Sequence, residues 1–140
     1  MEASGVETGR QAEMNGAGPS GGGGPRVCVI GAGSSGITAM RSLQEKGIDF
    51  VCFEKGSWIG GNWKYDNDNG QSAAYKSLHI NTSRQMMEYK AYPMPESLPD
   101  YPDHFQIAKY FEEYVDHFGL RDSIRFQTEI ESVVPAEGGG

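Results

Sequence analysis

Two short apolar runs, residues 27–30 and 49–53, flank a segment of mixed character near the start of the chain. Runs of this length without alternation are typical of strands buried on both faces of a parallel sheet. Between them, apolar residues recur at helical spacing from position 37 to 46, at Ile37, Met40 and Leu43. The pattern predicts a β-α-β unit and an α/β fold.

A second helix is predicted over residues 104–118. Asp103 is a favourable N-cap, and Gln106 three residues later completes a capping box. Gly119 provides a terminating residue that tolerates a left-handed backbone. The apolar face of this helix is formed by Ile107, Tyr110, Phe111, Tyr114, Val115 and Phe118.

The segment between the two predicted units has little regular periodicity. Residues 64–103 contain polar turns and a run rich in Pro and Tyr, which predicts an irregular loop region. Leu78 and Ile80 alternate with polar residues, which allows a short strand, and residues 86–89 suit a short helix or strand. After the second helix, residues 123–127 and 128–134 are predicted to form trailing β-strands.

Composition narrows the class of protein. The formal net charge of −7 argues against nucleic-acid binding, which needs a basic surface. No run approaches the 18 apolar residues of a membrane span, and no signal peptide is visible. We expect a cytoplasmic protein with a disordered Gly-rich tail over 1–24 and a loose end over 136–140. Cys28 and Cys52 are interpreted as small core residues rather than a redox pair.

A glycine motif joins the first predicted strand to the first predicted helix. Gly31, Gly33 and Gly36 have the Gly-x-Gly-x-x-Gly spacing, with Ala32, Ser34 and Ser35 between them. In a dinucleotide site these glycines permit a tight turn, close approach of a pyrophosphate and close helix packing. The helix N-terminus directs free N–H groups at the phosphates. Glu54 lies 18 positions after Gly36, where a carboxylate accepts hydrogen bonds from ribose hydroxyls and repels a 2′-phosphate. FAD or NAD is therefore favoured over NADP.

For other polar and aromatic segments, a role in ligand binding is weighed against an ordinary structural role. Gly60-Gly61-Asn62-Trp63 suits a loop that runs close to something flat or anionic, and Trp63 suits either packing or a place beside a cofactor ring. Residues 66–70 alternate oxygen ligands, but the later Glu of a calcium loop is missing, so we interpret them as a solvated turn. His104 and His117 are expected at the surface or at helix caps.

Residues 26–134 resemble the flavin-containing monooxygenases, in particular their soluble bacterial-type members. The resemblance rests on the glycine motif 31–36, Glu54, Gly60-Gly61-Asn62-Trp63, Lys76-Ser77-Leu78-His79-Ile80-Asn81-Thr82-Ser83, and the Tyr- and Pro-rich run with the helix after it. It implies that residues 31–36 hold the FAD pyrophosphate and that Glu54 binds the adenosine ribose. It also implies cofactor contacts at Lys55, Gly61, Asn62, Trp63 and Thr82, with Asn81 as the catalytic residue near the reactive flavin edge.

The same resemblance implies an activity. In this family NADPH reduces FAD, and the reduced flavin traps O₂ as a C4a-hydroperoxide. That species oxygenates a soft nucleophile such as an amine or sulfide. The amide of Asn81 would hydrogen-bond the intermediate without offering an acidic proton.

Several parts of the family pattern do not occur in the 140 residues. The second glycine motif, for NADPH, and the Phe-x-Gly-x-x-x-His signature are both absent from the sequence. We therefore expect an incomplete doubly wound parallel sheet, with residues 25–135 forming the N-terminal part of an FAD-binding domain in a truncated chain. A Baeyer–Villiger-type monooxygenase acting on ketones and a non-catalytic FAD-binding fragment are the alternatives.

Overall fold

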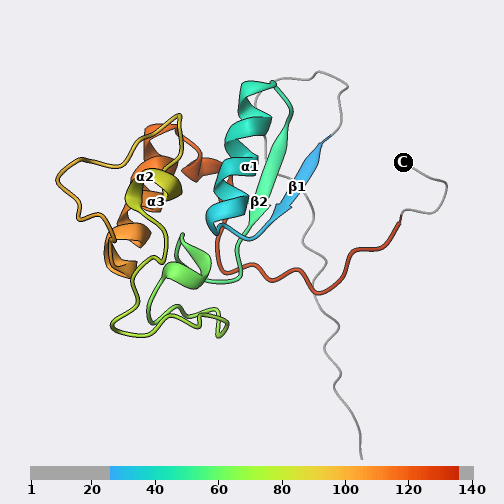
Figure 1. Ribbon diagram of the computed structural model, residues 1–140. Coiled ribbons are helices and arrows are strands. Elements are labelled where there is room, and N and C mark those ends of the chain that lie inside the picture. Colours follow the sequence, from blue (N-terminus) through green and yellow to red (C-terminus); the bar gives the residue numbers. More distant parts are fainter. Residues whose placement is uncertain (1–25, 136–140) are drawn as a thin grey trace, which may run out of the picture.

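The computed structural model describes residues 26–135, and the predicted tail and loose end lie outside this range. Figure 1 shows a small sheet beside α1, with α3 and the irregular loops on the far side of α1. The elements in chain order are β1 (Val27–Ile30), α1 (Ser34–Glu45), β2 (Phe50–Phe53), the 3-10 helix η1 (Gly61–Trp63), α2 (Arg84–Met87), α3 (His104–His117), the 3-10 helix η2 (Arg121–Ser123) and β3 (Ile124–Arg125).

The three described strands form one parallel sheet in the order β1-β2-β3. Val29 is the register partner of Cys52, which in turn pairs with Ile124. The predicted β-α-β unit is confirmed. The helix begins at Ser34, three residues before the predicted start, because its first turn is Ser-Ser-Gly and carries no apolar residue for the periodicity to detect.

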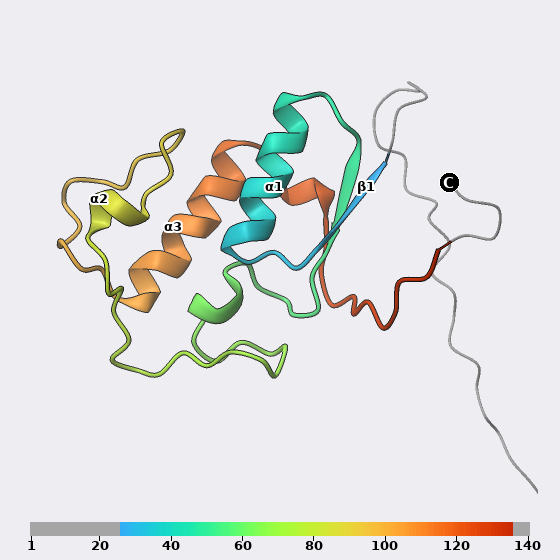
Figure 2. The same cartoon turned by 45° about the vertical axis from the view of Figure 1, so that its right-hand side comes forward.

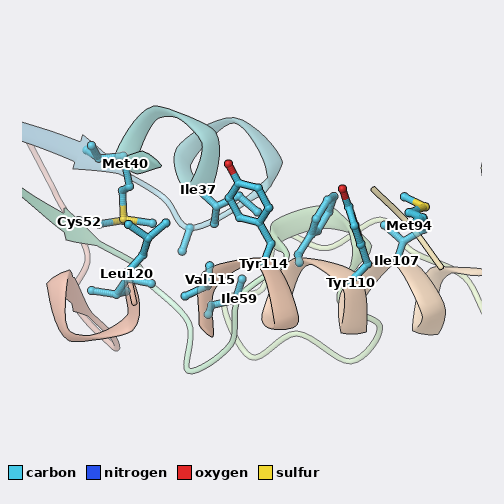
Figure 3. Packing of buried hydrophobic residues seen from close by; sticks show 14 of the residues in the cluster. Ile37, Met40, Cys52, Ile59, Met94, Ile107, Tyr110, Tyr114, Val115 and Leu120 are labelled. Carbon is cyan, nitrogen blue, oxygen red and sulfur yellow. The ribbon is translucent and has the colours of Figure 1, made fainter. Parts of the chain in front are cut away.

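The hydrophobic core lies mainly between α1 and α3. Both views place α1 between the sheet and α3 (Figures 1 and 2). Ile37 of α1 faces Tyr114 of α3 (Figure 3), and Met40 lies nearer Cys52 of the sheet. All four side chains are buried. Two amphipathic helices and one sheet face therefore bury each other's apolar sides.

The other face of the sheet is only partly covered by the described residues, so the expectation that β1 is buried on both faces is wrong. Ile30 is 60% exposed and Cys28 is also exposed, so the expectation that both cysteines are core residues is wrong for Cys28. Adjacent residues on a strand point to opposite faces, which directs Cys28 away from the α1 side where Val29 is buried. Cys52 is fully buried, and this burial, with a smaller effect of the Glu54 charge, raises its thiol pKa to about 12.

The predicted second helix is confirmed with its capping box. The Asp103 carboxylate accepts from the Gln106 amide at 2.9 Å, and the Gln106 side chain accepts from the Asp103 amide at 3.0 Å. Gly119 follows with φ +63. His104 was expected at the surface or at a helix cap. It lies at the start of α3, beside the N-cap Asp103, but a surface position is wrong, because its ring is fully buried and its centroid lies 4.0 Å from that of Phe105. His117 is exposed, as predicted.

The predicted irregular region is confirmed, but the short strand considered within it does not form, and the strands predicted after α3 form only in part. Instead of a strand at Leu78 and Ile80, a single antiparallel bridge joins His79 to Asp103. Of the two trailing strands predicted over 123–134, only the two-residue β3 forms. Gln127 takes φ 51, a left-handed conformation that turns the chain out of the sheet, and no further strand is assigned up to residue 135.

A cluster of tyrosines joins α3 to the loop after α2. Its members are Tyr89, Tyr92, Tyr110 and Tyr114, with ring centroids between 4.9 and 6.0 Å apart. The Tyr110 hydroxyl accepts from the Tyr89 amide at 2.8 Å and donates to the Tyr92 carbonyl at 2.6 Å. One phenol of α3 therefore satisfies two backbone groups of the loop.

Tyr110→Phe is expected to lower the free energy of unfolding by about 1–3 kcal/mol, because it leaves the Tyr89 amide and the Tyr92 carbonyl without their partner in a half-buried loop. Urea denaturation measures this loss. Tyr92→Phe is the matched control, since the Tyr92 hydroxyl makes no hydrogen bond within residues 26–135. Equal free energies of unfolding for Tyr110→Phe and Tyr92→Phe would contradict the role of the Tyr110 hydroxyl as the partner of both backbone groups.

Candidate cofactor-binding site

The glycine motif forms a tight turn between β1 and α1. Gly31 has φ +90, and its amide donates to the Phe53 carbonyl of β2 at 2.8 Å. A Cβ placed on Gly36 would lie 1.9 Å from the Gly31 carbonyl oxygen. The helix therefore starts against the strand end at a distance that only glycine permits.

The N-terminus of α1 has no side chain covering it. Gly33 is the N-cap, no side-chain cap bond is formed, and the first turn contains no acidic residue. The first amides of a helix have no partner within the helix and carry the positive end of its dipole. Ser34, Ser35 and Gly36 therefore present backbone donors suited to an anion.

Glu54 lies beside this turn, at the end of β2. Its carboxylate accepts from the Ala32 amide at 2.7 Å and from the Gly56 amide at 2.8 Å, one bond to each oxygen. The residue is only 4% exposed. Each carboxylate oxygen has a second lone-pair direction, so two further donors, such as ribose hydroxyls, can be accepted. The sequence predicts the ligand role; the structure adds that Glu54 fixes the turn itself.

The Gly60-Gly61 loop packs directly on the turn. The Gly60 amide donates to the Ala32 carbonyl at 3.0 Å. A Cβ on Gly61 would lie 3.1 Å from the Gly33 Cα, and both loop glycines have positive φ. These glycines were expected to approach something flat or anionic, and the structure shows that they approach the backbone of the turn. Three segments distant in sequence thus meet at Ala32 and Gly33.

The remaining residues of the 55–63 segment contact other parts of the chain. The Asn62 side-chain oxygen accepts from the Ala73 amide at 2.7 Å. Trp63 is half-buried against the hydrophobic core, which fits the packing interpretation of this side chain. The exposed Lys55 ammonium lies 2.9 Å from the Glu129 carboxylate. Contacts of these three residues with a cofactor stay predictions.

Asn81 and Thr82 lie just after the bridge between His79 and Asp103. Both side chains are exposed, and neither makes a hydrogen bond within residues 26–135. The neighbouring Ile80 amide donates to the Pro102 carbonyl at 3.1 Å, which anchors this part of the loop. The structure does not join Asn81 to the glycine turn through any hydrogen bond, so its catalytic role stays a prediction.

Two features of the site have no counterpart in the sequence expectations. A Cβ on Gly56 would lie 2.8 Å from oxygens of both Asn67 and Asp68, so the turn at 66–70 packs closely on the residue after Lys55. The Ser57 hydroxyl and amide donate to the Asp68 carboxylate, which lowers the pKa of that carboxyl. The Tyr89 hydroxyl donates to the Ser34 carbonyl at 3.1 Å. The glycine two positions after Glu54 could have indicated the close packing of the 66–70 turn. No local sequence pattern indicates the hydrogen bond from Tyr89 to Ser34.

Comparison with known proteins agrees with this arrangement. A profile described as "Flavin-binding monooxygenase-like" matches residues 24–137. The chain belongs to this family, which confirms the resemblance. Flavin-containing monooxygenase 5 of Oryctolagus cuniculus is 42% identical over 112 residues, which cover 79% of this chain and 21% of that protein. The chain thus spans about a fifth of the length of the curated relatives that it matches.

Solved structures with the same fold are also monooxygenases. The S-allyl-L-cysteine S-oxygenase of Allium sativum superimposes with a TM-score of 0.73 at 28% identity, covering 81% of this chain and 30% of that one. An oxidized steroid monooxygenase bound to NADP gives a TM-score of 0.68 at 27% identity, covering 79% and 20%. The described residues therefore form a partial Rossmann-like α/β unit. Among residues 26–135, no helix has the length and apolar character that crossing a bilayer requires.

Proposed function

We propose that this chain holds FAD for an FAD- and NADPH-dependent monooxygenase that transfers one oxygen atom from O₂ to an amine or sulfide. The observation that carries the proposal is the meeting of three segments at one place: the uncapped start of α1, the buried Glu54 carboxylate and the Gly60-Gly61 loop. Membership of the flavin-binding monooxygenase-like family supports FAD as the occupant.

The residues fit the adenosine diphosphate half of FAD. The backbone donors of residues 34–36 suit the pyrophosphate, and the second lone pairs of Glu54 suit the ribose hydroxyls. Gly33 is partly exposed and has no Cβ, which leaves room for phosphate oxygens above the turn. The positions expected near the flavin, Asn81 and Thr82, have exposed side chains that make no hydrogen bond to the described part of the chain.

Bound FAD would supply the electron transfer and the activation of O₂. The contribution of this chain is to bind and orient it, through fixed backbone donors and a carboxylate already held in place. Likeness to an S-oxygenase favours a sulfur substrate, and the NADP of the steroid monooxygenase supports NADPH as reductant.

A ketone substrate is the second candidate, because the chain is also similar to a cyclohexanone monooxygenase with cyclohexanone bound, with a TM-score of 0.65 at 28% identity. The reaction product distinguishes a sulfur substrate from a ketone substrate. Oxygen transfer to a thioether gives a sulfoxide, whereas a Baeyer–Villiger reaction gives an ester. The NADPH motif does not occur in these 140 residues, so the test uses a protein in which this chain is joined to an NADPH-binding domain. Its incubation with FAD, NADPH, O₂ and one substrate of each kind, followed by mass spectrometry of the products, assigns the substrate class. Cytoplasmic location remains part of the proposal.

Gly33→Ala is expected to weaken FAD binding at least tenfold while leaving the free energy of unfolding within about 0.5 kcal/mol of the parent. An alanine Cβ fits the unliganded turn, because its nearest neighbour, the Gly61 Cα, lies 3.7 Å away and the φ of −79 suits any residue. The same methyl occupies the space above the turn that a pyrophosphate needs. Flavin fluorescence titration and urea denaturation of the 140-residue chain measure the two quantities.

Ser42→Ala on the exposed side of α1, away from the glycine turn, is the control. It should leave FAD affinity unchanged. Binding of FAD by Gly33→Ala as tight as by the parent would contradict the placement of the pyrophosphate. Failure of the parent chain to bind FAD would contradict the proposed function itself.

A further inference from the structure

Tyr89 reaches the glycine turn from a distant part of the chain. Its hydroxyl donates to the Ser34 carbonyl at 3.1 Å, although the two residues are 55 positions apart. The ring packs on α3, stacked on Phe111 with centroids 6.0 Å apart and edge-on to Tyr114 at 4.9 Å. Burial raises the pKa of the phenol well above its usual value, so the hydroxyl keeps its proton and remains a donor.

A second hydroxyl lies near the same carbonyl. The Thr38 hydroxyl, one helical turn further along α1, lies 3.1 Å from the Ser34 oxygen and 2.9 Å from the Ser35 oxygen, so its single proton serves both carbonyls and Tyr89 is the side chain that donates to Ser34 alone. The Ser34 carbonyl and the Ser35 N–H belong to one planar peptide unit and lie at its opposite ends. Donation to the oxygen draws electron density along this unit and makes the N–H a stronger donor, as in a chain of cooperative hydrogen bonds. Because the first-turn N–H groups are directed out of the helix start, this strengthening acts where an anion would bind.

The position of Tyr89 is itself fixed by α3. Its amide donates to the Tyr110 hydroxyl at 2.8 Å, and that hydroxyl is anchored on the Tyr92 carbonyl. Tyr110 is 1% exposed. A continuous set of contacts therefore runs from the interior of α3, through Tyr89, to the first peptide of α1.

We propose that Tyr89 is a positioning residue for the cofactor pyrophosphate, acting through the hydrogen bond that its hydroxyl donates to the Ser34 carbonyl. This inference rests on the proposed function, since it assumes that a pyrophosphate binds at the start of α1. It predicts that the phenol hydroxyl contributes to the affinity for ligands that carry the diphosphate and contributes nothing to the affinity for the nucleoside.

The test is Tyr89→Phe in the 140-residue chain, which keeps the aromatic packing and removes only the hydroxyl. FAD and ADP are expected to bind roughly three- to tenfold more weakly, as for the loss of one hydrogen bond. Adenosine affinity, measured by displacement of FAD or by NMR titration, should not change. The Ser35 amide proton should also move upfield in the unliganded chain, because its peptide carbonyl has lost a donor. Tyr101→Phe is the control, since that side chain is exposed.

The outcomes separate this inference from the proposed function. Binding of FAD and ADP by Tyr89→Phe as tight as by the parent overturns the role of Tyr89 while the cofactor assignment stands. An equal loss for adenosine, FAD and ADP shows a general loss of structure and overturns the positioning role. A parent chain that binds neither FAD nor ADP overturns both.

Discussion

Gly36→Ala is expected to lower the free energy of unfolding by at least about 3 kcal/mol and to abolish FAD binding. An alanine Cβ at this position would lie 1.9 Å from the Gly31 carbonyl oxygen and 3.0 Å from the Gly31 carbonyl carbon. Both neighbours are backbone atoms, so no side chain can rotate to make room. Gly31 is in turn tied to β2 through its bond to Phe53. Relief of the clash therefore has to move α1 away from β1.

Urea denaturation of Gly36→Ala beside Gly33→Ala provides the measurement and its control. Both variants add one methyl group to the same turn. The added Cβ would lie 1.9 Å from the nearest backbone atom in Gly36→Ala and 3.7 Å from it in Gly33→Ala. Gly33→Ala is expected to retain the stability of the parent. A Gly36→Ala chain within about 1 kcal/mol of the parent would show that the turn opens easily, contrary to the packing described here.

Glu54→Gln is expected to reduce stability by about 3 kcal/mol even without FAD, and to weaken FAD binding further. The carboxylate accepts one amide on each oxygen inside the protein, and hydrogen bonds to a charged acceptor contribute about 1.5–3 kcal/mol each. A glutamine side chain has one oxygen. Its NH₂ group would face the amide of either Ala32 or Gly56, which leaves two donors opposed and unsatisfied.

Glu129→Gln is the matched control for that experiment. Glu129 is also a carboxylate, but it forms an ion pair with Lys55 at the surface and its side chain is 57% exposed. Exposed pairs of this kind contribute about 0–1 kcal/mol. Thermal or urea unfolding of the unliganded chains compares the two variants. A loss for Glu54→Gln no greater than for Glu129→Gln would exclude the structural role of Glu54.

The elements with a repeating pattern were predictable. The apolar runs marked the positions of β1 and β2, and the apolar face of α3 marked the side of that helix that is buried. The continuous run of β1 did not show that the face carrying Cys28 and Ile30 is exposed. The glycine turn was predictable because Gly31 has a positive φ and Gly36 approaches the Gly31 carbonyl at a distance that excludes a Cβ. Gly33 and Glu54 were predictable from their spacing within the motif. Asp103 and Gln106 marked the start of α3 through bonds between near neighbours in the chain.

What the pattern missed depends on distant contacts. The bond from Tyr89 to Ser34 joins residues 55 positions apart and has no local signature. The strand predicted over 128–134 has apolar residues at suitable spacing, but Gln127 turns the chain out of the sheet, where no described strand pairs with it. For His104, at the end of a predicted helix, the expectation was a surface or cap position, whereas its ring is fully buried beside the rings of Tyr65 and Phe105.

The position of β1 at the end of the strand order affects the behaviour of the chain in solution. Its four residues are all apolar, with neither proline nor charge, and its outer backbone groups face no strand among residues 26–135. Natural edge strands usually carry prolines or charged residues, which discourage the addition of a further strand. Colloidal stability of this chain therefore depends on long-range repulsion from its net charge of −7, which salt screens. Dilute, low-salt buffer is the condition in which single molecules should persist.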